Sequence, residues 1–166
     1  MKTKKHPSQI DIKHLFRYCS GNLVYRFVNS NRVKVGDIAG SLDKHGYIQI
    51  EINNRRYQLH RLIWIYHNET IPEGMQIDHI NHDRSDNRID NLRLATHSQN
   101  LGNQKGSSKK GLPKGVSTQS SSKNPFQARI YINCKNVNLG SFHTPELANA
   151  AYAKAAKEHF GEFACS

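Results

Sequence analysis

The stretch Gln76–Asn103, QIDHINHDRSDNRIDNLRLATHSQNLGN, constrains the fold more than any other part of this chain. It opens with an apolar and polar alternation over Ile77–Ile80, which is the two-residue period of a half-buried strand. The run 81–90 is rich in Asn, Asp and Ser and predicts a loop. Alternation resumes over 91–95 and predicts a second strand that returns beside the first.

A short helix is expected to follow the second strand, because Thr96 and Ser98 are both candidate N-caps. The stretch therefore predicts a strand–loop–strand–helix unit. Asp78 and His79 would lie on its first strand, and Asn100 would lie on its helix.

These side chains suit the cleavage of a phosphodiester, which requires a base to deprotonate water and a cation to offset the charge on phosphate. His79 is the candidate base, since an unperturbed imidazole titrates near neutral pH. Asp78 and Asn100 offer oxygen ligands, which favour Mg²⁺ or Mn²⁺ over zinc. His82 is a rival base, but it falls in the predicted loop. Asp83, Asp86 and Asp90 are expected to form loop turns and caps, because the spacing of a calcium loop is absent.

The segment resembles the ββα-metal motif of HNH endonucleases, in the version found in phage and intron homing enzymes. The resemblance implies that His79 is the general base and that Asp78 and Asn100 bind the metal. It also implies that Asn91 holds the loop so that His79 points correctly. A similar order of strand, His-Arg-Leu helix and turn extends the likeness back to about Gly46.

His60, at the start of that expected helix, leaves two interpretations open. It is either a further active-site group or a histidine that packs beneath the ββα unit. The elements expected before the motif are a helix over Asp11–Cys19, strands over Asn22–Val28 and Val35–Ala39, a hairpin of Tyr47–Ile52 with Arg55–Leu59, and a helix over His60–His67.

Charge indicates a polyanionic partner, since the net charge is +11 and the sequence pI is near 9.7. The motif itself is locally acidic: residues 77–100 carry four acidic and three basic side chains. Residues 101–125 carry five lysines and no acid. Basic flanks beside a locally acidic site are what a metal-dependent nuclease requires.

The three cysteines, Cys19, Cys134 and Cys165, are far apart, and no CxxC pair exists. Neither a structural zinc nor a disulfide framework is therefore expected. The sequence shows no apolar stretch long enough to span a membrane and no signal-peptide pattern. A cytoplasmic location follows as the expectation, in the host cell if the gene belongs to a phage.

A second module is expected after a basic linker. Strands are predicted over Val116–Gln119, Phe126–Ile132 and Val137–Leu139, followed by a helix over Pro145–His159 that Thr144 would cap. In the middle strand the residues at 126, 128, 130 and 132 are apolar, while Gln127, Arg129 and Tyr131 occupy the other face.

This module resembles an AP2 domain, the three-stranded sheet plus helix of plant transcription factors that is also appended to phage HNH proteins. The likeness rests on Lys114-Gly115-Val116, Ala128-Arg129-Ile130, Leu139-Gly140-Ser141-Phe142, Thr144, Glu146, Ala148, Ala150-Ala151-Tyr152 and Phe160-Gly161. It implies that the outer face of the sheet enters the DNA major groove, where a β-ribbon fits. A Trp-Gly pair of the plant pattern is replaced here by Ser-rich sequence and Phe126, so site preference does not transfer. The expected DNA contacts are Lys105, Lys109, Lys110, Lys114, Lys123, Gln127, Arg129, Tyr131 and Lys135.

The sequence as a whole predicts an α+β protein with a flexible tail (1–9), an HNH domain (10–103, core 76–103), a linker (104–114) and an AP2-like domain (115–166). The expected function is a homing-type, Mg²⁺- or Mn²⁺-dependent endonuclease that nicks double-stranded DNA as a monomer or weak dimer. Two alternatives are a DNA-binding regulator whose HNH half is a scaffold, and an RNA-binding module. Comparison of the affinities for duplex DNA and for RNA at several salt concentrations tests the RNA-binding alternative.

Overall fold

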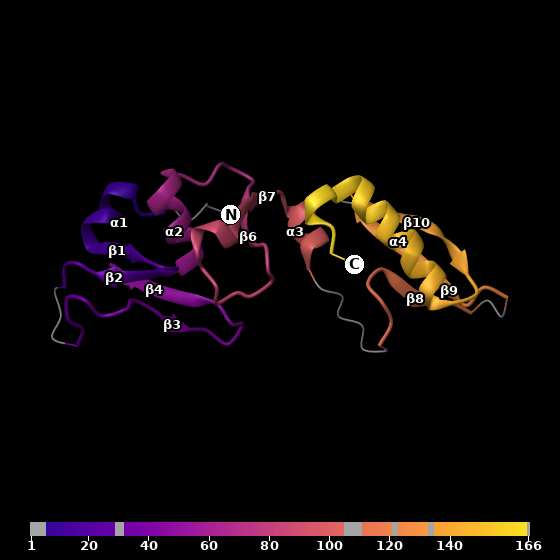
Figure 1. Cartoon of the computed structure of the whole chain (residues 1–166), viewed down its shortest axis with the longest axis horizontal. Coiled ribbons are helices and arrows are strands. Elements are labelled where there is room, and N and C mark those ends of the chain that lie inside the picture. Colours follow the sequence, from indigo (N-terminus) through magenta and orange to yellow (C-terminus); the bar gives the residue numbers. More distant parts are fainter. Residues whose placement is uncertain (1–5, 29–31, 105–110, 121–122, 133–134, 166) are drawn as a thin grey trace. The chain divides into compact units, whose positions relative to one another are not determined.

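The computed structural model describes residues 6–28, 32–104, 111–120, 123–132 and 135–165. The chain divides into two compact units, Met1–Leu94 and Ala95–Ser166, and each is described by itself (Figure 1). Four residues singled out in the sequence, Lys105, Lys109, Lys110 and Cys134, lie outside the described residues, as do residues 1–5 of the predicted tail. No helix in the described part of the chain is long and apolar enough to cross a membrane.

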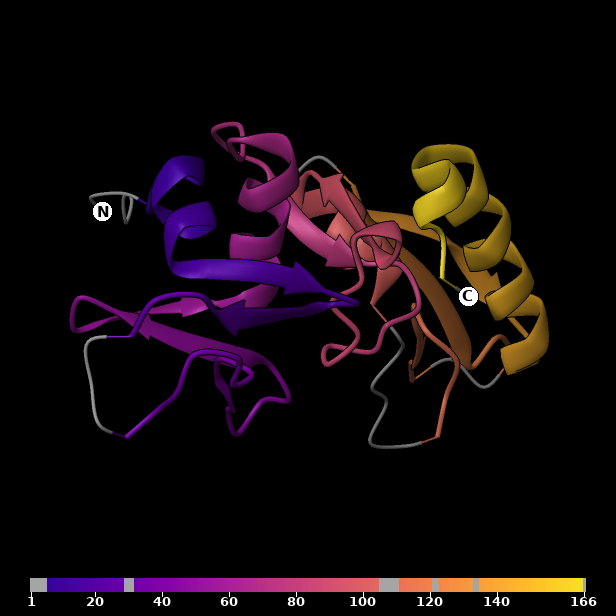
Figure 2. The ribbon, with the colours of Figure 1, turned by 60° about the vertical axis from the view of Figure 1, so that its left-hand side comes forward.

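The first unit begins with α1 (Gln9–Leu15), followed by β1 (Phe16–Cys19) and β2 (Asn22–Tyr25), which pair antiparallel (Figure 2). Ser8 caps α1 and forms a reciprocal capping box with Asp11, so the helix starts inside the predicted tail. The predicted helix over residues 11–19 is wrong in its second half. Phe16 is extended, pairs with Tyr25 and is buried in the core, so the chain turns to strand there.

A three-stranded antiparallel sheet in the order β3 (Ser41–Leu42), β4 (Ile48–Ile52), β5 (Arg55–Gln58) leads into α2 (Leu59–Asn68). The predicted hairpin is confirmed. Asn53 and Asn54 form its turn with φ of 50° and 58°, as the tight turns of twisted hairpins require. The predicted strand over residues 35–39 is wrong, because its ladder is reduced to an isolated bridge between Val24 and Ile38.

One hydrophobic core joins these elements to the motif. It consists of Ile12, Phe16, Leu23, Ala39, Ile50, Ile52, Tyr57, Leu59, Leu62, Ile63, Ile65, Ile77 and Leu92. The motif contributes β6 (Gln76–His79), a 3-10 turn η1 (Ile89–Asn91) and β7 (Leu92–Ala95), and β6 and β7 form a two-stranded sheet. The predicted strand, loop and strand are therefore present within one residue of the expected boundaries.

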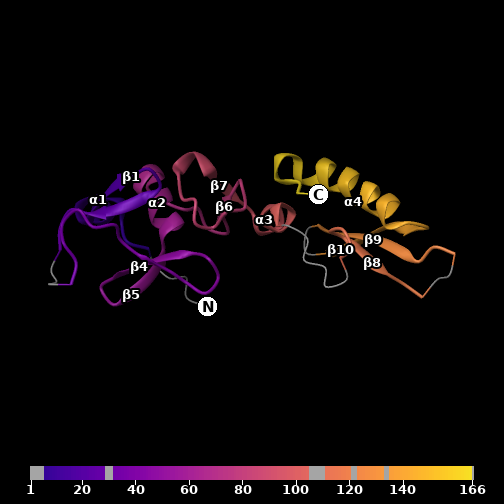
Figure 3. The ribbon, with the colours of Figure 1, turned by 60° about the horizontal axis from the view of Figure 1, so that its bottom comes forward.

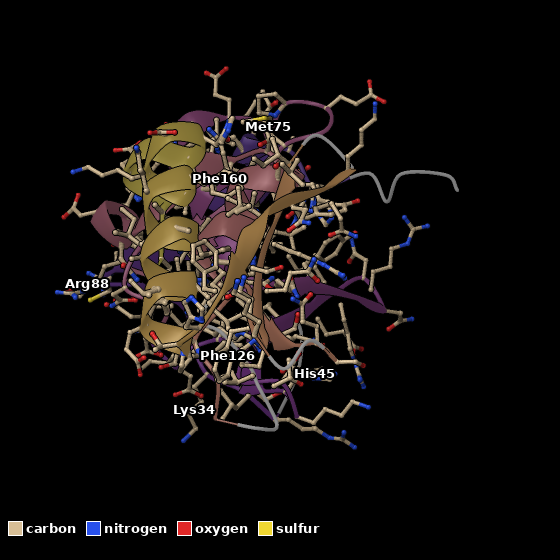
Figure 4. The ribbon with its side chains drawn as sticks, turned by 90° about the vertical axis from the view of Figure 1, so that its right-hand side faces the viewer. Lys34, His45, Met75, Arg88, Phe126 and Phe160 are labelled. Atoms are coloured by element: carbon tan, nitrogen blue, oxygen red, sulfur yellow. The ribbon has the colours of Figure 1, made fainter. Side chains whose placement is uncertain are left out.

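The second unit contains α3 (His97–Asn103), β8 (Val116–Thr118), β9 (Phe126–Ile132), β10 (Lys135–Phe142), α4 (Pro145–Phe160) and a final 3-10 turn η2 (Gly161–Phe163). Its antiparallel sheet has the order β10-β9-β8, and α4 lies along one face (Figure 3). The apolar side of β9 packs against the helix, where Ile130 shares one core cluster with Tyr152 and Phe160. Phe160 is labelled on α4 in Figure 4. Arg129 and Tyr131 are exposed on the opposite side, as the alternation predicted.

Candidate active site

Asp78 and His79 lie side by side in sequence on β6, and each is only 6% exposed. Adjacent strand residues point to opposite faces, so burial of both requires a cover on each side. Asp78 forms an ion pair with Arg93 of β7. His79 contacts Asn87 of the loop and His60 of α2. A buried charge and a buried imidazole are costly unless they are paired, which makes this strand the candidate site of the unit.

His79 is tied to the loop by a hydrogen bond between its Nε2 and Oδ1 of Asn87, at 3.1 Å. Asn87 is 1% exposed, so this bond lies in the interior. Burial lowers the pKa of His79, while the bond to Asn87 and the carboxylate of Asp78 act in the opposite direction. The net shift keeps the imidazole neutral near physiological pH, which is the form that a base needs.

His60 of α2 packs its ring edge against His79, with 5.0 Å between the ring centroids and 75° between the ring planes. It is 4% exposed, and its Nδ1 has no hydrogen-bond partner. Burial, followed by the charge of His79 and of Arg61, lowers the pKa of His60 to about 3. A buried neutral ring packed edge-on against the candidate base favours the second interpretation of His60, a histidine that packs beneath the unit.

Asn91 cross-links the loop that carries Asn87. Its Nδ2 donates to Oδ1 of Asn81 at 2.9 Å and to the carbonyl of Asp86 at 2.7 Å, and its Oδ1 accepts from the Asn81 N–H at 3.0 Å. The Ile80 N–H donates to the Asn91 carbonyl at 2.9 Å. Both ends of the loop are thereby joined through one side chain.

The loop aspartates form turns, in agreement with the sequence. Asp83 Oδ1 accepts from the N–H and the hydroxyl of Ser85, and Asp86 accepts from Arg88 through two guanidinium nitrogens. The Arg88 bonds hold the pKa of Asp86 well below its usual range. His82 occupies the loop with a positive φ of 66°.

The donor chemistry of the predicted metal ligands is that of a hard cation. Asp78 is a carboxylate whose Oδ2 accepts from Arg93 Nε at 3.0 Å. Asn100 adds an amide, and it lies on α3, whose N-terminus Thr96 caps with Gln99 in a capping box. Ser98, the other cap candidate, lies within the helix. In residues 6–28, 32–104, 111–120, 123–132 and 135–165, no group of three or more His, Cys, Asp or Glu could hold a metal ion. Asp78 belongs to the first unit and Asn100 to the second, and carboxylate and amide oxygens are donors of the kind that Mg²⁺ or Mn²⁺ prefers.

Tyr47 borders the histidines and Arg84 stacks on Tyr47. Neither residue was found from the sequence. The ring of Tyr47 lies 5.4 Å from that of His60 and 6.2 Å from that of His79. The guanidinium of Arg84 stacks 4.8 Å above Tyr47 and donates to the His45 carbonyl at 2.9 Å. An exposed cation is therefore held over Tyr47, whose ring neighbours the candidate base.

The outer face of the sheet in the second unit presents a row of polar groups. In the strand register Arg129 is opposite Asn138, Tyr131 is opposite Asn136, and Gln127 is opposite Ser141 of β10 and Ser117 of β8. Opposed residues share a face. No acidic residue occurs between Leu101 and Thr144. Lys123 and Lys135 are exposed near the strand ends.

Lys114 has a different environment from the other predicted contacts. Its ammonium donates to the carbonyls of Leu101, Gly102 and Cys165, and it lies 5.8 Å from the centre of the Tyr152 ring. Partial burial lowers its pKa. Because an ammonium has three N–H donors, this geometry favours a structural role within the second unit.

The elements β6, loop, β7 and α3 follow one another in the order of a ββα motif, and the first strand carries the buried Asp78 and His79. Residues 57–101 match the family model of the HNH endonuclease. The chain is 38% identical over 124 residues to the uncharacterized HNH endonuclease L560 of Acanthamoeba polyphaga mimivirus, a match that covers 74% of this chain and 63% of that protein. A solved structure of DNA binding and cleavage by the HNH homing endonuclease I-HmuI is 28% identical, with a TM-score of 0.41, over 51% of this chain and 48% of the other. Residues 57–101 of this chain are thus similar to a segment of HNH endonucleases.

Proposed function

We propose that this chain is a metal-dependent endonuclease of the homing type that hydrolyses phosphodiester bonds in double-stranded DNA. The observation that carries the proposal is the buried Asp78–His79 pair on β6, beside a loop cross-linked by Asn91, within the segment that matches the HNH family. The chain spans 63% of the length of its viral relative, and the activity is proposed for this chain on its own residues.

In the proposed mechanism His79 removes a proton from a water molecule aligned with the scissile phosphorus. Asp78 and Asn100 would hold Mg²⁺ or Mn²⁺, and Arg93 orients the Asp78 carboxylate through the 3.0 Å bond to Oδ2. A bound divalent cation supplies positive charge to the phosphate and to the departing 3′ oxygen. Asn91 keeps the loop closed against β6. One such site per chain cuts one strand, so each monomer would nick, and a weak dimer would break both strands.

DNA affinity would come from the sheet of the second unit, whose strands carry no acidic side chain. Its outer face would enter the major groove in the manner of an AP2 domain. The proposed contacts are Gln127, Arg129 and Tyr131 on β9, with Lys123 and Lys135 toward phosphates. Lys105, Lys109 and Lys110 remain proposed backbone contacts. Lys114 is left out because its ammonium is engaged with backbone carbonyls.

A plasmid-nicking assay with and without Mg²⁺ tests the proposal. Wild-type protein should convert supercoiled DNA to open circle only with the metal. His79→Ala and Asn100→Ala should abolish conversion while they retain binding, and His45→Ala, an exposed histidine, should cut normally. Linear product that rises with protein concentration would indicate a dimer. Normal cutting by His79→Ala would remove that residue from the mechanism. Binding of natural-source DNA without any cleavage would favour the regulator instead.

A further inference from the structure

We propose that Asn87 is a positioning residue that holds His79 as the tautomer with its hydrogen on Nε2, so that Nδ1 accepts the proton from water. This inference rests on the proposed nuclease function. It assigns a role to a loop asparagine that the sequence presents only as a turn residue.

The direction of the Asn87 amide is fixed by a second hydrogen bond. Its Nδ2 donates to the Ser85 carbonyl at 2.9 Å, so its Oδ1 must be the atom that faces His79 at 3.1 Å. The reverse orientation would set two acceptors, the amide oxygen and the Ser85 carbonyl, against each other. Oδ1 can only accept, so the imidazole Nε2 must carry the hydrogen. In the neutral ring the lone pair then lies on Nδ1.

The bond is formed where water is excluded. Asn87 is 1% exposed and His79 is 6% exposed. In such a setting an amide oxygen or a ring N–H without a partner is costly, so the paired tautomer is strongly preferred. The edge-on contact of His60 at 5.0 Å further restricts rotation of the His79 ring. Tautomer and ring direction are therefore set together.

The backbone around Asn87 is itself held by the β1–β2 hairpin. Tyr18 Oη accepts the Ile89 N–H at 3.2 Å. Gly21 has a φ of +86°, and a Cβ there would lie 2.9 Å from the backbone nitrogen of Arg88. A glycine is required at that turn both for its conformation and for this approach. The hairpin, which precedes the family-matched residues 57–101, thus supports the loop that positions His79.

Ring ¹⁵N chemical shifts of labelled histidine test the tautomer without any cleavage, with His79 assigned by comparison with His79→Gln. Wild-type protein above the histidine titration range should show a protonated Nε2 and an unprotonated Nδ1. Asn87→Leu, which keeps the size but removes the acceptor, should give a mixture of tautomers. Asn87→Asp keeps an acceptor toward Nε2 and should retain the Nε2–H form, although its second oxygen replaces the donor to the Ser85 carbonyl.

Nicking kinetics give the second readout. Asn87→Leu should lower kcat by about 100-fold, as expected for a misdirected catalytic group, with KM changed less than about twofold. Asn87→Asp should recover part of that loss. Asn68→Leu makes the same substitution on the exposed end of α2 and should leave kcat unchanged. Trp64 fluorescence during urea unfolding checks that each variant is folded.

A wild-type ring protonated on Nδ1 would overturn the inference whatever the variants do, and so would full kcat in a folded Asn87→Leu protein. A wild-type protein with the Nε2–H ring that cuts no DNA in any metal would instead refute the nuclease proposal, and the catalytic role of Asn87 with it. The two failures are therefore distinguishable.

Discussion

Acidification should destabilise the first unit through His60, because the folded protein keeps this ring neutral. Burial is the main cause of the depressed pKa, which falls from 6.5 to about 3, and the neighbouring His79 and Arg61 add to it. The other ring that faces it is Tyr47, at 5.4 Å. Below pH 6.5 the unfolded chain takes up a proton at this position and the folded chain does not.

The magnitude follows from the two pKa values. At pH 8 His60 is neutral in both states and contributes no difference. At pH 5 the unfolded form is stabilised by the bound proton by about 2 kcal/mol, while the folded ring is still almost fully neutral. The free energy of unfolding therefore loses nothing to His60 above pH 6.5, and it declines as the pH falls from there toward the folded-state pKa of this residue. A loss of 2 kcal/mol is a large share of a typical domain's free energy of unfolding.

Urea unfolding at pH 8 and pH 5 measures this effect, with the single tryptophan, Trp64 on α2, as a reporter inside the first unit. The His60→Phe variant cannot take up the proton, so its loss of free energy between the two pH values should be smaller by about 2 kcal/mol than that of the wild type. His45→Gln removes an exposed histidine and should behave as the wild type does. Equal pH dependence in wild type and His60→Phe would refute the reasoning.

Three further outcomes are expected in the second unit. Lys114→Met should destabilise it by about 1–3 kcal/mol, because three carbonyls lose a donor, while the salt dependence of DNA binding stays unchanged; a reduced salt slope at wild-type stability would contradict this. Gly115→Ala should prevent stable folding of the unit in thermal unfolding by circular dichroism, since φ is +75° and a Cβ would collide with the Tyr152 ring. Arg129→Ala should weaken DNA binding and reduce the salt slope by about 1, with no change in Tm; unaltered affinity would remove this face from recognition.

The spacing of apolar residues predicts an element correctly where it fits either the period of a strand or that of a helix, but not both. Residues 126–132 alternate cleanly, and β9 is buried and exposed in that order. Residues 11–19 carry Ile12, Leu15 and Phe16 at helical spacing, so the pattern fits a longer helix than the one formed. The chain leaves the helix at Phe16 because pairing with β2 satisfies its backbone and still buries the ring. The spacing of apolar residues within 11–19 cannot show that pairing with β2 competes with the helix.

The side chains that complete the site could not be predicted because their roles depend on contacts far apart in sequence or on the path of the loop. Asn87 lies in a run of turn-forming residues and is chemically indistinguishable there from its neighbours. Tyr47 belongs to a hairpin strand, and its proximity to His79 exists only after β4, α2 and β6 share one core. Outside the site, Lys114 of the second unit likewise looks like a solvated linker lysine in the sequence, and its structural role depends on three carbonyl partners.

The same contacts show that the family-matched residues 57–101 depend on earlier parts of the first unit. The Ile89 N–H of the loop donates to Tyr18 on β1, and Arg84 donates to the His45 carbonyl before β4. Both acceptors lie earlier in the sequence than the matched residues. The buried face of α2 likewise rests on Ile12, Phe16 and other residues of the N-terminal elements. A histidine whose tautomer is set by a loop amide needs that loop in one conformation. The N-terminal hairpin therefore supports the loop of the candidate site as well as the core of the unit.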